Sequence, residues 1–416
     1  ADPSSLALLL RRVISTEEGR VPWLLATRPS AANDGLEDCP RITLQPLSVE
    51  AVRDLVASLC LENLHEDEWA PLLVQRTGGN PLFVVQTLTA AFEAGTLQGG
   101  TPSVLAPLPT SLSTLLVARL EKLSVQARSI ARLASVAGVD FTLELACQLL
   151  QQTPAVMADA WQELHGAQVM RDGGFAHDLI RDACQQITPA DVKGLMHAQV
   201  ARALLERHAP AARVAAHWEA AARWPEAALA YELAAAHAHE CDAVADELLK
   251  LKAAARCHLE CGDAKSLSAA IALEHRALHL RIAIGQLTEE TLQDCESLLA
   301  RAGDEEQLVA AQRLLAYYWA ERFEPERALP WAEAALQGAT RHGHEREALL
   351  AAQRVGAVLS RLGRHEEALQ CMRPRSNRLQ MLTRDERLNW RSDFGSALDY
   401  ADQRQEALQV LTDVVE

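Results

Sequence analysis

The pattern of hydrophobic and polar positions changes character near residue 48. Before that point, the apolar run from Val21 to Thr27 has no polar alternation and ends at Arg28-Pro29. Such a run is typical of a strand buried on both faces of a parallel sheet. A helix from about Pro3 to Ile14 is expected before it, and a short strand-like segment, Arg41 to Leu44, after it. Residues 1–46 are therefore predicted to be α/β.

Helical spacing of apolar residues begins at Ser48 and predicts three helices, at Val49 to Leu61, Glu66 to Arg76 and Leu82 to Ala94. The turn Thr77-Gly78-Gly79-Asn80-Pro81 separates the second of these helices from the third. A stretch rich in Gly, Pro and Thr then follows, and we expect residues 95–109 to be a linker.

The next segment, Ser111 to about Ala209, is predicted to hold several short helices with one interruption. That interruption, residues 168–177, consists of two short extended stretches on either side of Gly173-Gly174. Extended stretches around a Gly-Gly turn are typical of a β-hairpin. Helices followed by a small hairpin form the pattern of a winged helix-turn-helix.

From about Val214 to the end, only helices are predicted, and a short motif recurs. Its four copies are Trp224 to Leu229, Glu324 to Leu329, Arg364 to Leu369 and Gln403 to Leu408. In the last three copies, Ala328, Ala368 and Ala407 lie 40 and 39 residues apart (368 − 328 and 407 − 368). A small residue beside a Leu suits the second helix of a closely crossing pair. Leu362-Gly363 would end a first helix, with glycine just past its end.

This spacing resembles that of tetratricopeptide-like repeats, whose helix pairs stack into a solenoid with a usual period of roughly 34 residues and longer variants near 40. The alternative is a set of unrelated helices that happen to share similar surface turns. The two interpretations differ in whether the small residues lie at helix crossings.

Composition agrees with a helical chain that does not bind nucleic acid. Hydrophobic residues make up 49% of the chain and aromatic residues only 4%, with Ala and Leu, both strong helix formers, dominant. The net charge of −16 repels phosphate backbones, so direct DNA or RNA binding is not expected. The irregular spacing of the nine cysteines favours buried thiols in a reducing, cytoplasmic compartment. No apolar run is long enough to span a membrane.

Five segments occur in an order that resembles one protein family. They are Ala1 to Leu6, Trp23 to Pro29, Leu44 to Ser48, Thr77 to Phe83 and Phe175 to Asp182. In this order they resemble the signal-transducing P-loop ATPases of the STAND class, in particular bacterial regulators that join an AAA-like ATPase to helical repeats. The likeness covers the first half of the chain closely and the repeats only in style.

The resemblance implies that Ala1-Asp2-Pro3 follows the Walker B strand, so that the phosphate loop and the Mg²⁺ ligands lie upstream. No phosphate-loop motif occurs in this chain. ATP or ADP with Mg²⁺ is therefore expected as the cofactor of the full-length protein and not of this chain alone. Whether the full-length protein hydrolyses ATP stays open, and no catalytic residue is assigned here. The resemblance also implies oligomerisation on activation.

The resemblance assigns nucleotide contacts to five residues. Arg28, at the strand end, would sense the γ-phosphate with a guanidinium that can bind oxygens bidentately; the alternative is a surface arginine. Gly79-Asn80-Pro81 would place the proline ring against adenine; the turn can equally be a helix start with Asn80 as N-cap and Pro81 at N1, and both can hold together. His177 would sense the β-phosphate; the alternative is a structural histidine.

Other chemistry has little support in the sequence. His237, His239 and Cys241, with the later Cys257, His258 and Cys261, could suggest a zinc site. Cys257 and Cys261 share a helix face, but there is no C-x₂-C pair, so buried thiols are favoured over a metal site. No motif for nucleophilic catalysis or dinucleotide binding is present.

We therefore predict a mainly α chain in four parts. These are the end of a P-loop ATPase core (1–46), a helical lid and linker (47–109), a winged-helix-like domain (110–210) and tetratricopeptide-like repeats (211–416). The predicted function is a nucleotide-dependent signalling switch, with transcriptional regulation as the output, whose repeats bind a protein partner or a small-molecule inducer. The rival is a non-enzymatic repeat adaptor with a degenerate ATPase remnant.

Overall fold

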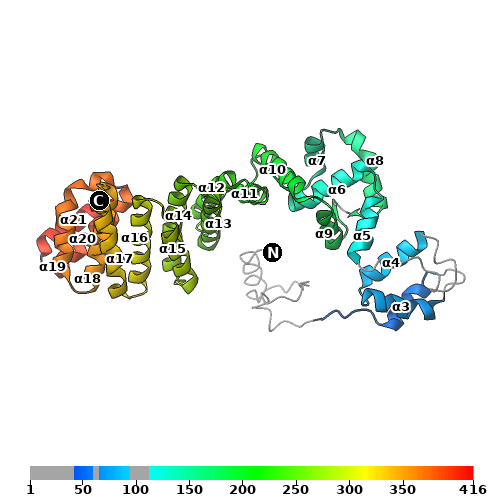
Figure 1. The fold of residues 1–416 in the computed structure, drawn as a ribbon, viewed down its shortest axis with the longest axis horizontal. Coiled ribbons are helices and arrows are strands. Elements are labelled where there is room, and N and C mark those ends of the chain that lie inside the picture. Colours follow the sequence, from blue (N-terminus) through cyan, green and yellow to red (C-terminus); the bar gives the residue numbers. More distant parts are fainter. Residues whose placement is uncertain (1–41, 60–64, 94–111, 172, 416) are drawn as a thin grey trace, which may run out of the picture. The chain divides into compact units, whose positions relative to one another are not determined.

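A computed structural model describes residues 42–59, 65–93, 112–171 and 173–415 of the chain (Figure 1). The chain forms two compact units, Ala1–Ala203 and Leu204–Glu416, and both consist mainly of helices in their described parts. The predicted helix at 3–14, the strand at 21–27 and the linker at 95–109 lie outside the described residues. None of the described helices is both long and apolar enough to cross a membrane.

The first unit begins with three helices around a small apolar core. They are α2 (Val49–Ala57), α3 (Glu66–Thr77) and α4 (Pro81–Glu93). Ser48 caps α2 by accepting a hydrogen bond from the backbone N–H of Ala51 at 3.2 Å. Trp69 and Leu73 of α3 are fully buried against Val84 and other apolar residues of α2 and α4. All three helices were expected from the apolar spacing.

Two expectations in this region were wrong. The first helix ends at Ala57 and not at Leu61, because the hydroxyl of Ser58 bonds the backbone oxygen of Leu55 at 2.6 Å and competes with continued helix. Residues 42–44 form no strand. Ile42 and Leu44 are 83% and 90% exposed, and a strand needs a neighbour to pair with its backbone, which the described part of this unit does not supply there.

The rest of the first unit is helical except for one hairpin. Its elements are α5 (Leu112–Glu121), α6 (Val125–Ala137), η3 (Gly138–Asp140), α7 (Leu143–Leu150), α8 (Pro154–Gly166), β1 (Met170–Arg171), β2 (Gly174–Phe175), α9 (Asp178–Gln186) and α10 (Ala190–Glu206). The strands pair antiparallel, with Met170 opposite Phe175. Gly173 has φ +83° at the turn, which a glycine adopts freely. The hairpin prediction is confirmed; the winged-helix assignment stays a prediction.

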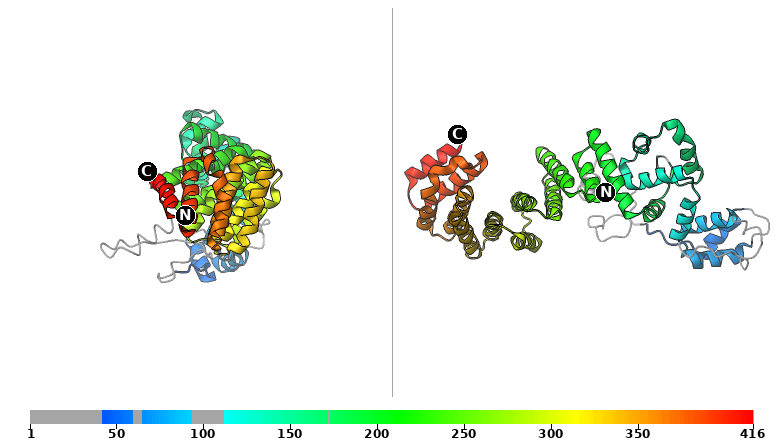
Figure 2. Two further views of the ribbon diagram at one scale, coloured as in Figure 1. Left: turned by 90° about the vertical axis from the view of Figure 1, so that its left-hand side faces the viewer. Right: turned by 45° about the horizontal axis from the view of Figure 1, so that its top comes forward.

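The second unit is a succession of helices that pack on their neighbours in the chain. They are α11 (Ala211–Ala220), α12 (Trp224–Glu240), α13 (Val244–Cys261), α14 (Ala264–Ala283), α15 (Glu289–Arg301), α16 (Glu305–Glu321), α17 (Pro325–Arg341), α18 (Glu345–Arg361), α19 (His365–Met372), η4 (Arg373–Met381), α20 (Arg384–Tyr400) and α21 (Arg404–Val415). In addition, α14 packs on α16, α16 on α18 and α18 on α20. Figure 2 shows these later helices side by side.

The repeated motif marks the start of a helix at each of its four copies, which begin α12, α17, α19 and α21. Ala328, Ala368 and Ala407 are buried, with 0%, 0% and 3% of their surface exposed. Gly363, just past α18, has φ +74°, as expected of a glycine that ends a helix. The small residues therefore lie in the core, which favours stacked repeats over unrelated helices.

Two glycines on the first helices of later pairs also allow close crossings. A Cβ atom added at Gly356 of α18 would lie 2.8 Å from Cγ of Met372 on α19. A Cβ atom added at Gly395 of α20 would lie 2.6 Å from Cγ of Leu411 on α21. The two glycines are 39 residues apart (395 − 356), so the repeat is present in both helices of a pair.

Candidate functional site

The turn between α3 and α4 contains three of the five residues assigned to nucleotide contacts. Gly78 and Gly79 both have positive φ, +62° and +72°. The side-chain oxygen of Asn80 accepts a hydrogen bond from the backbone N–H of Phe83 at 3.2 Å, which makes Asn80 the cap of α4. Pro81 is the first residue of α4 and its side chain is exposed. The expected helix start is confirmed, and the exposed proline ring is free to contact a planar group.

Gly79 is held against the segment that precedes α2. The backbone N–H of Leu47 donates to the backbone oxygen of Gly79 at 2.8 Å. A Cβ atom at Gly79 would lie 2.5 Å from the backbone oxygen of Leu47 and 3.1 Å from Cβ of Pro46. With its positive φ, this approach requires glycine at position 79. A backbone hydrogen bond therefore links two of the five family-like segments, Leu44 to Ser48 and Thr77 to Phe83.

His177 is the N-cap residue of α9. Its Nδ1 atom accepts a hydrogen bond from the backbone N–H of Leu179 at 3.2 Å, so the ring caps the helix. The side chain is exposed, which leaves Nε2 open to solvent. The recorded hydrogen bonds of His177 all go to the first turn of α9 and not to the Gly79 turn. Its phosphate-sensing role stays a prediction, and Arg28 lies outside the described residues.

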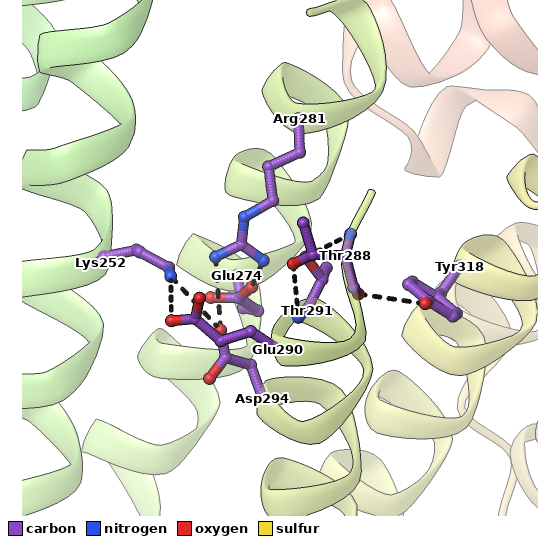
Figure 3. A network of polar contacts seen from close by, with 8 residues as sticks. All are labelled: Lys252, Glu274, Arg281, Thr288, Glu290, Thr291, Asp294 and Tyr318. Carbon is purple, nitrogen blue, oxygen red and sulfur yellow. Dashed lines mark hydrogen bonds and ion pairs between the residues drawn. The ribbon is translucent and has the colours of Figure 1, made fainter. Parts of the chain in front are cut away.

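A buried ionic network joins α13, α14 and α15 in the second unit (Figure 3). The Arg281 guanidinium lies 2.5 Å from the Glu274 carboxylate and 3.3 Å from that of Asp294, and the first two side chains are 4% and 5% exposed. Nζ of Lys252 lies 3.0 Å from Glu290 and 3.7 Å from Asp294. Burial raises the pKa of Glu274, which the Arg281 charge counteracts. The network therefore links α13, α14 and α15 through ion pairs that share charged groups.

A second polar group lies along the helices that pack as a row, α14, α16, α18 and α20. We define the polar row as His275 and His279 of α14, Tyr317 of α16, Arg354 of α18 and Asp393 of α20. The row lies on helix faces that pack on one another, and such faces are normally lined by apolar residues.

Contacts within the polar row link the helices in sequence. The Tyr317 hydroxyl lies 2.7 Å from Nδ1 of His279, and the Tyr317 ring centre lies 4.6 Å from the His279 ring centre and 5.6 Å from that of His275. The Arg354 guanidinium carbon lies 4.0 Å over the Tyr317 ring, a cation–π contact. Asp393 accepts a hydrogen bond from the Gln353 amide at 2.8 Å.

Ion pairs border the polar row. Arg313 pairs with Glu347 at 2.5 Å, and Arg361 pairs with Glu321 at the same distance. Each pair bridges α16 and α18, so the charges at the border satisfy one another.

The sequence analysis missed the polar row, although a signal was present. Arg313, which borders the row, Gln353, which donates to Asp393, and Asp393 itself are polar residues at a spacing of 40 residues (353 − 313 and 393 − 353). A polar position that recurs with the repeat period indicates one continuous polar face.

Burial favours the uncharged forms of the two imidazoles in the polar row. Burial lowers the pKa of His275 well below its usual 6.5, and the charges of Arg313 and Arg354 act in the same direction. The pKa of His279 is lowered first by burial and then by Arg354. Burial raises the pKa of Tyr317 to about 12. Both imidazoles are therefore neutral near pH 7, and the Tyr317 hydroxyl keeps its proton.

The repeats should lose stability as the pH falls through 6.5, the usual pKa of histidine. Below that pH the unfolded chain protonates His275 and the folded chain does not, so the loss should reach about 1 kcal/mol by about pH 5.5. Burial raises the pKa of Asp393, and this works in the opposite direction. Denaturant unfolding at several pH values measures the slope. His275→Gln should reduce it and exposed His237→Gln should not; equal slopes for wild type and His275→Gln would contradict this.

The repeats also contain a cavity of about 530 Å³ at the adjoining ends of α13 to α16. His258, Arg301, Asp304 and Gln307 are among the residues that line it. His258 contacts the Glu232 carboxylate through Nε2 at 2.7 Å, while its Nδ1 is buried and has no hydrogen-bond partner. The volume lies within the usual range for small-ligand pockets. In the described ranges, no group of three or more His, Cys, Asp or Glu side chains could hold a metal ion.

Comparison with known proteins gives little beyond this description. No family model and no curated protein matches the chain. Among solved structures, it is similar to a Signal Transduction ATPase with Numerous Domains (STAND) protein with a tetratricopeptide repeat sensor from Pyrococcus horikoshii, with 13% identity and a TM-score of 0.35. The match covers 88% of this chain but only 61% of that protein. A likeness this low establishes neither the fold nor the function of this chain.

Proposed function

We propose that this chain is part of a nucleotide-dependent signalling switch of the STAND type, in which the helical repeats bind a protein partner or a small-molecule ligand. The observation that carries the binding role is the polar row on α14, α16, α18 and α20. Tyr317 is buried, His275, Arg354 and Asp393 are half-buried, and His279 is exposed. Half-buried polar side chains stabilise a stack less than apolar residues of similar volume would. Their presence on one continuous face is better explained by recognition than by folding.

The row has the composition of a recognition surface. It combines a guanidinium, two neutral imidazoles, a phenol hydroxyl and a carboxylate, so it offers hydrogen-bond donors and acceptors close to one another. Tyr and Arg are also the residues that contribute most to binding energy in protein interfaces. The ion pairs that border the row neutralise the charges at its edge when no ligand is bound.

The nucleotide role rests on the first unit. Its support is the order of the five family-like segments and the bond that joins two of them at Gly79. In the proposed switch, ATP or ADP with Mg²⁺ binds the full-length protein, and Pro81, Arg28 and His177 respond to the adenine and the phosphates. A change in nucleotide would alter how the lid helices α2 to α4 are held, and the output is transcriptional regulation or another signal. The rival proposal, a repeat adaptor without a working nucleotide site, shares the same binding face.

ATP titration of the wild type and of Pro81→Ala separates the two proposals. In the full-length protein, loss of the exposed ring should remove an apolar contact with adenine and weaken ATP binding about fivefold, or about 1 kcal/mol. Pro71→Ala is the matched control, because Pro71 is also exposed but lies within α3 and away from the turn. Isothermal titration with ATP and ADP gives the affinities. Absence of ATP binding by the wild type would favour the adaptor, and equal, measurable affinities for wild type and Pro81→Ala would contradict the contact between Pro81 and adenine.

A further inference from the structure

Arg354 differs from the other arginines around the polar row. Arg313 and Arg361 each pair with a carboxylate at 2.5 Å. In contrast, Arg354 forms no ion pair or hydrogen bond with the described residues, and its guanidinium lies over the Tyr317 ring. The side chain is only partly exposed. Its nitrogens are not among the buried polar atoms that lack a partner, so its N–H donors are open to solvent and to a ligand.

The surroundings of Arg354 keep its donors unpaired. Asp393 of α20 is near enough to raise the pKa of Arg354, yet its recorded hydrogen bond is with Gln353. Burial nevertheless lowers the pKa of Arg354 overall, which indicates a charge without full compensation. The face of the guanidinium is covered by Tyr317, so the N–H groups at its edge are the ones left to bind.

The His279 ring adds a donor beside this edge. When the Tyr317 hydroxyl donates a hydrogen bond to Nδ1 of the neutral His279 ring, the ring carries its proton on Nε2. Nε2–H is then a donor on the same row as Arg354. Arg313 and Glu321 of α16 pair with Glu347 and Arg361 of α18. The Asp393 carboxylate accepts from Gln353. The N–H groups of Arg354 and His279 therefore remain as donors, and they suit a ligand rich in acceptors.

We infer that Arg354 binds the oxyanion of a small ligand, a carboxylate or a phosphate group, with the Tyr317 ring holding the guanidinium in position. This inference rests on the proposed binding role of the repeats and names the chemistry of the ligand. A planar guanidinium matches the two oxygens of an oxyanion bidentately, which a lysine ammonium does not. The partly buried position of Arg354 between helices suits a small group better than a broad protein surface.

Titration of the full 416-residue chain with citrate and with inorganic phosphate, at constant ionic strength, tests the inference. We expect saturable binding to at least one of the two in isothermal titration, and the pair of probes separates carboxylate from phosphate. Arg354→Gln should weaken that binding about 10-fold or more, since a hydrogen bond to a charged group contributes that much. The oxyanion affinity of Arg354→Lys should lie between those of wild type and Arg354→Gln. Exposed Arg341→Gln on α17 is the matched control and should bind like wild type.

Two further variants distinguish a ligand contact from loss of folding. Tyr317→Phe keeps the ring under Arg354 and should retain oxyanion binding, whereas Tyr317→Leu removes the ring and should weaken it with Arg354 still present. Circular dichroism melts of each variant identify any that fail to fold. If Arg354→Gln melts like wild type and binds the oxyanion equally well, the assignment of Arg354 is wrong.

Absence of oxyanion binding would also overturn the inference, and a second measurement then decides the fate of the proposed function. Amide exchange in α14 to α20 would be followed with a panel of neutral metabolites and short peptides. Protection that depends on Tyr317 would keep the proposed binding role and exclude the oxyanion. If no probe protects these helices, both the oxyanion inference and the proposed binding role are wrong.

Discussion

Replacement of Arg281 with leucine should destabilise the repeats by about 3–5 kcal/mol, the usual cost of removing one partner from a buried ion pair. Arg281 lies between the carboxylates of Glu274 and Asp294 (Figure 3), and it is 4% exposed. Without the guanidinium, Glu274 would remain buried with no opposite charge in contact. Its pKa, already raised by burial, would rise further, and the residue would be protonated or the helices would separate.

Denaturant unfolding, read by amide exchange in α14 and α15, measures this effect. Lys252→Leu is the control within the same network, because its side chain is 35% exposed and its pairs should contribute only about 0–1 kcal/mol. The double variant Glu274→Leu with Arg281→Leu should recover most of the loss, since apolar residues can replace a buried pair. A loss below about 1 kcal/mol for Arg281→Leu would show that the network contributes little to stability.

Replacement of Ala368 with leucine should cost about 1–3 kcal/mol through overpacking. Ala368 is fully buried where α19 crosses its neighbours, and there is no room for a longer side chain. In a stack where each repeat leans on the next, the disturbance should spread to α18 and α20. The expected result is a lower melting temperature together with faster amide exchange on both sides of Leu362-Gly363.

Gln370→Leu is the matched control, because Gln370 is two positions along the same helix and exposed. It should change neither the melting temperature nor the exchange of the neighbouring helices. Equal tolerance of leucine at positions 368 and 370 would contradict the stacking of the repeats.

The helices of this chain could be predicted because their signals are local. The spacing of apolar residues, the cap at Asn80 and the glycine after Leu362 each act within one or two turns. The buried alanines of the repeats were found for a similar reason, since a repeated motif places one type of environment at one spacing.

The polar row and the buried network could not be predicted in the same way. Arg281 meets Asp294 across two helices, and Arg354 meets Tyr317 on another helix altogether. These contacts depend on how the helices cross, which local patterns do not specify. The strand expected at Arg41 to Leu44 is absent over its described residues, 42–44, for a related reason: an extended apolar segment becomes a strand only beside a partner.

The measurement that tests the central claim most directly is amide exchange in the full-length protein with ADP and with a non-hydrolysable ATP analogue. A switch requires that nucleotide and repeats be coupled, so that the two nucleotides leave different signatures at both places. We predict different exchange at the Thr77 to Pro81 turn and along α14 to α20. Tight binding of both nucleotides with identical exchange along α14 to α20 would contradict the proposed switch.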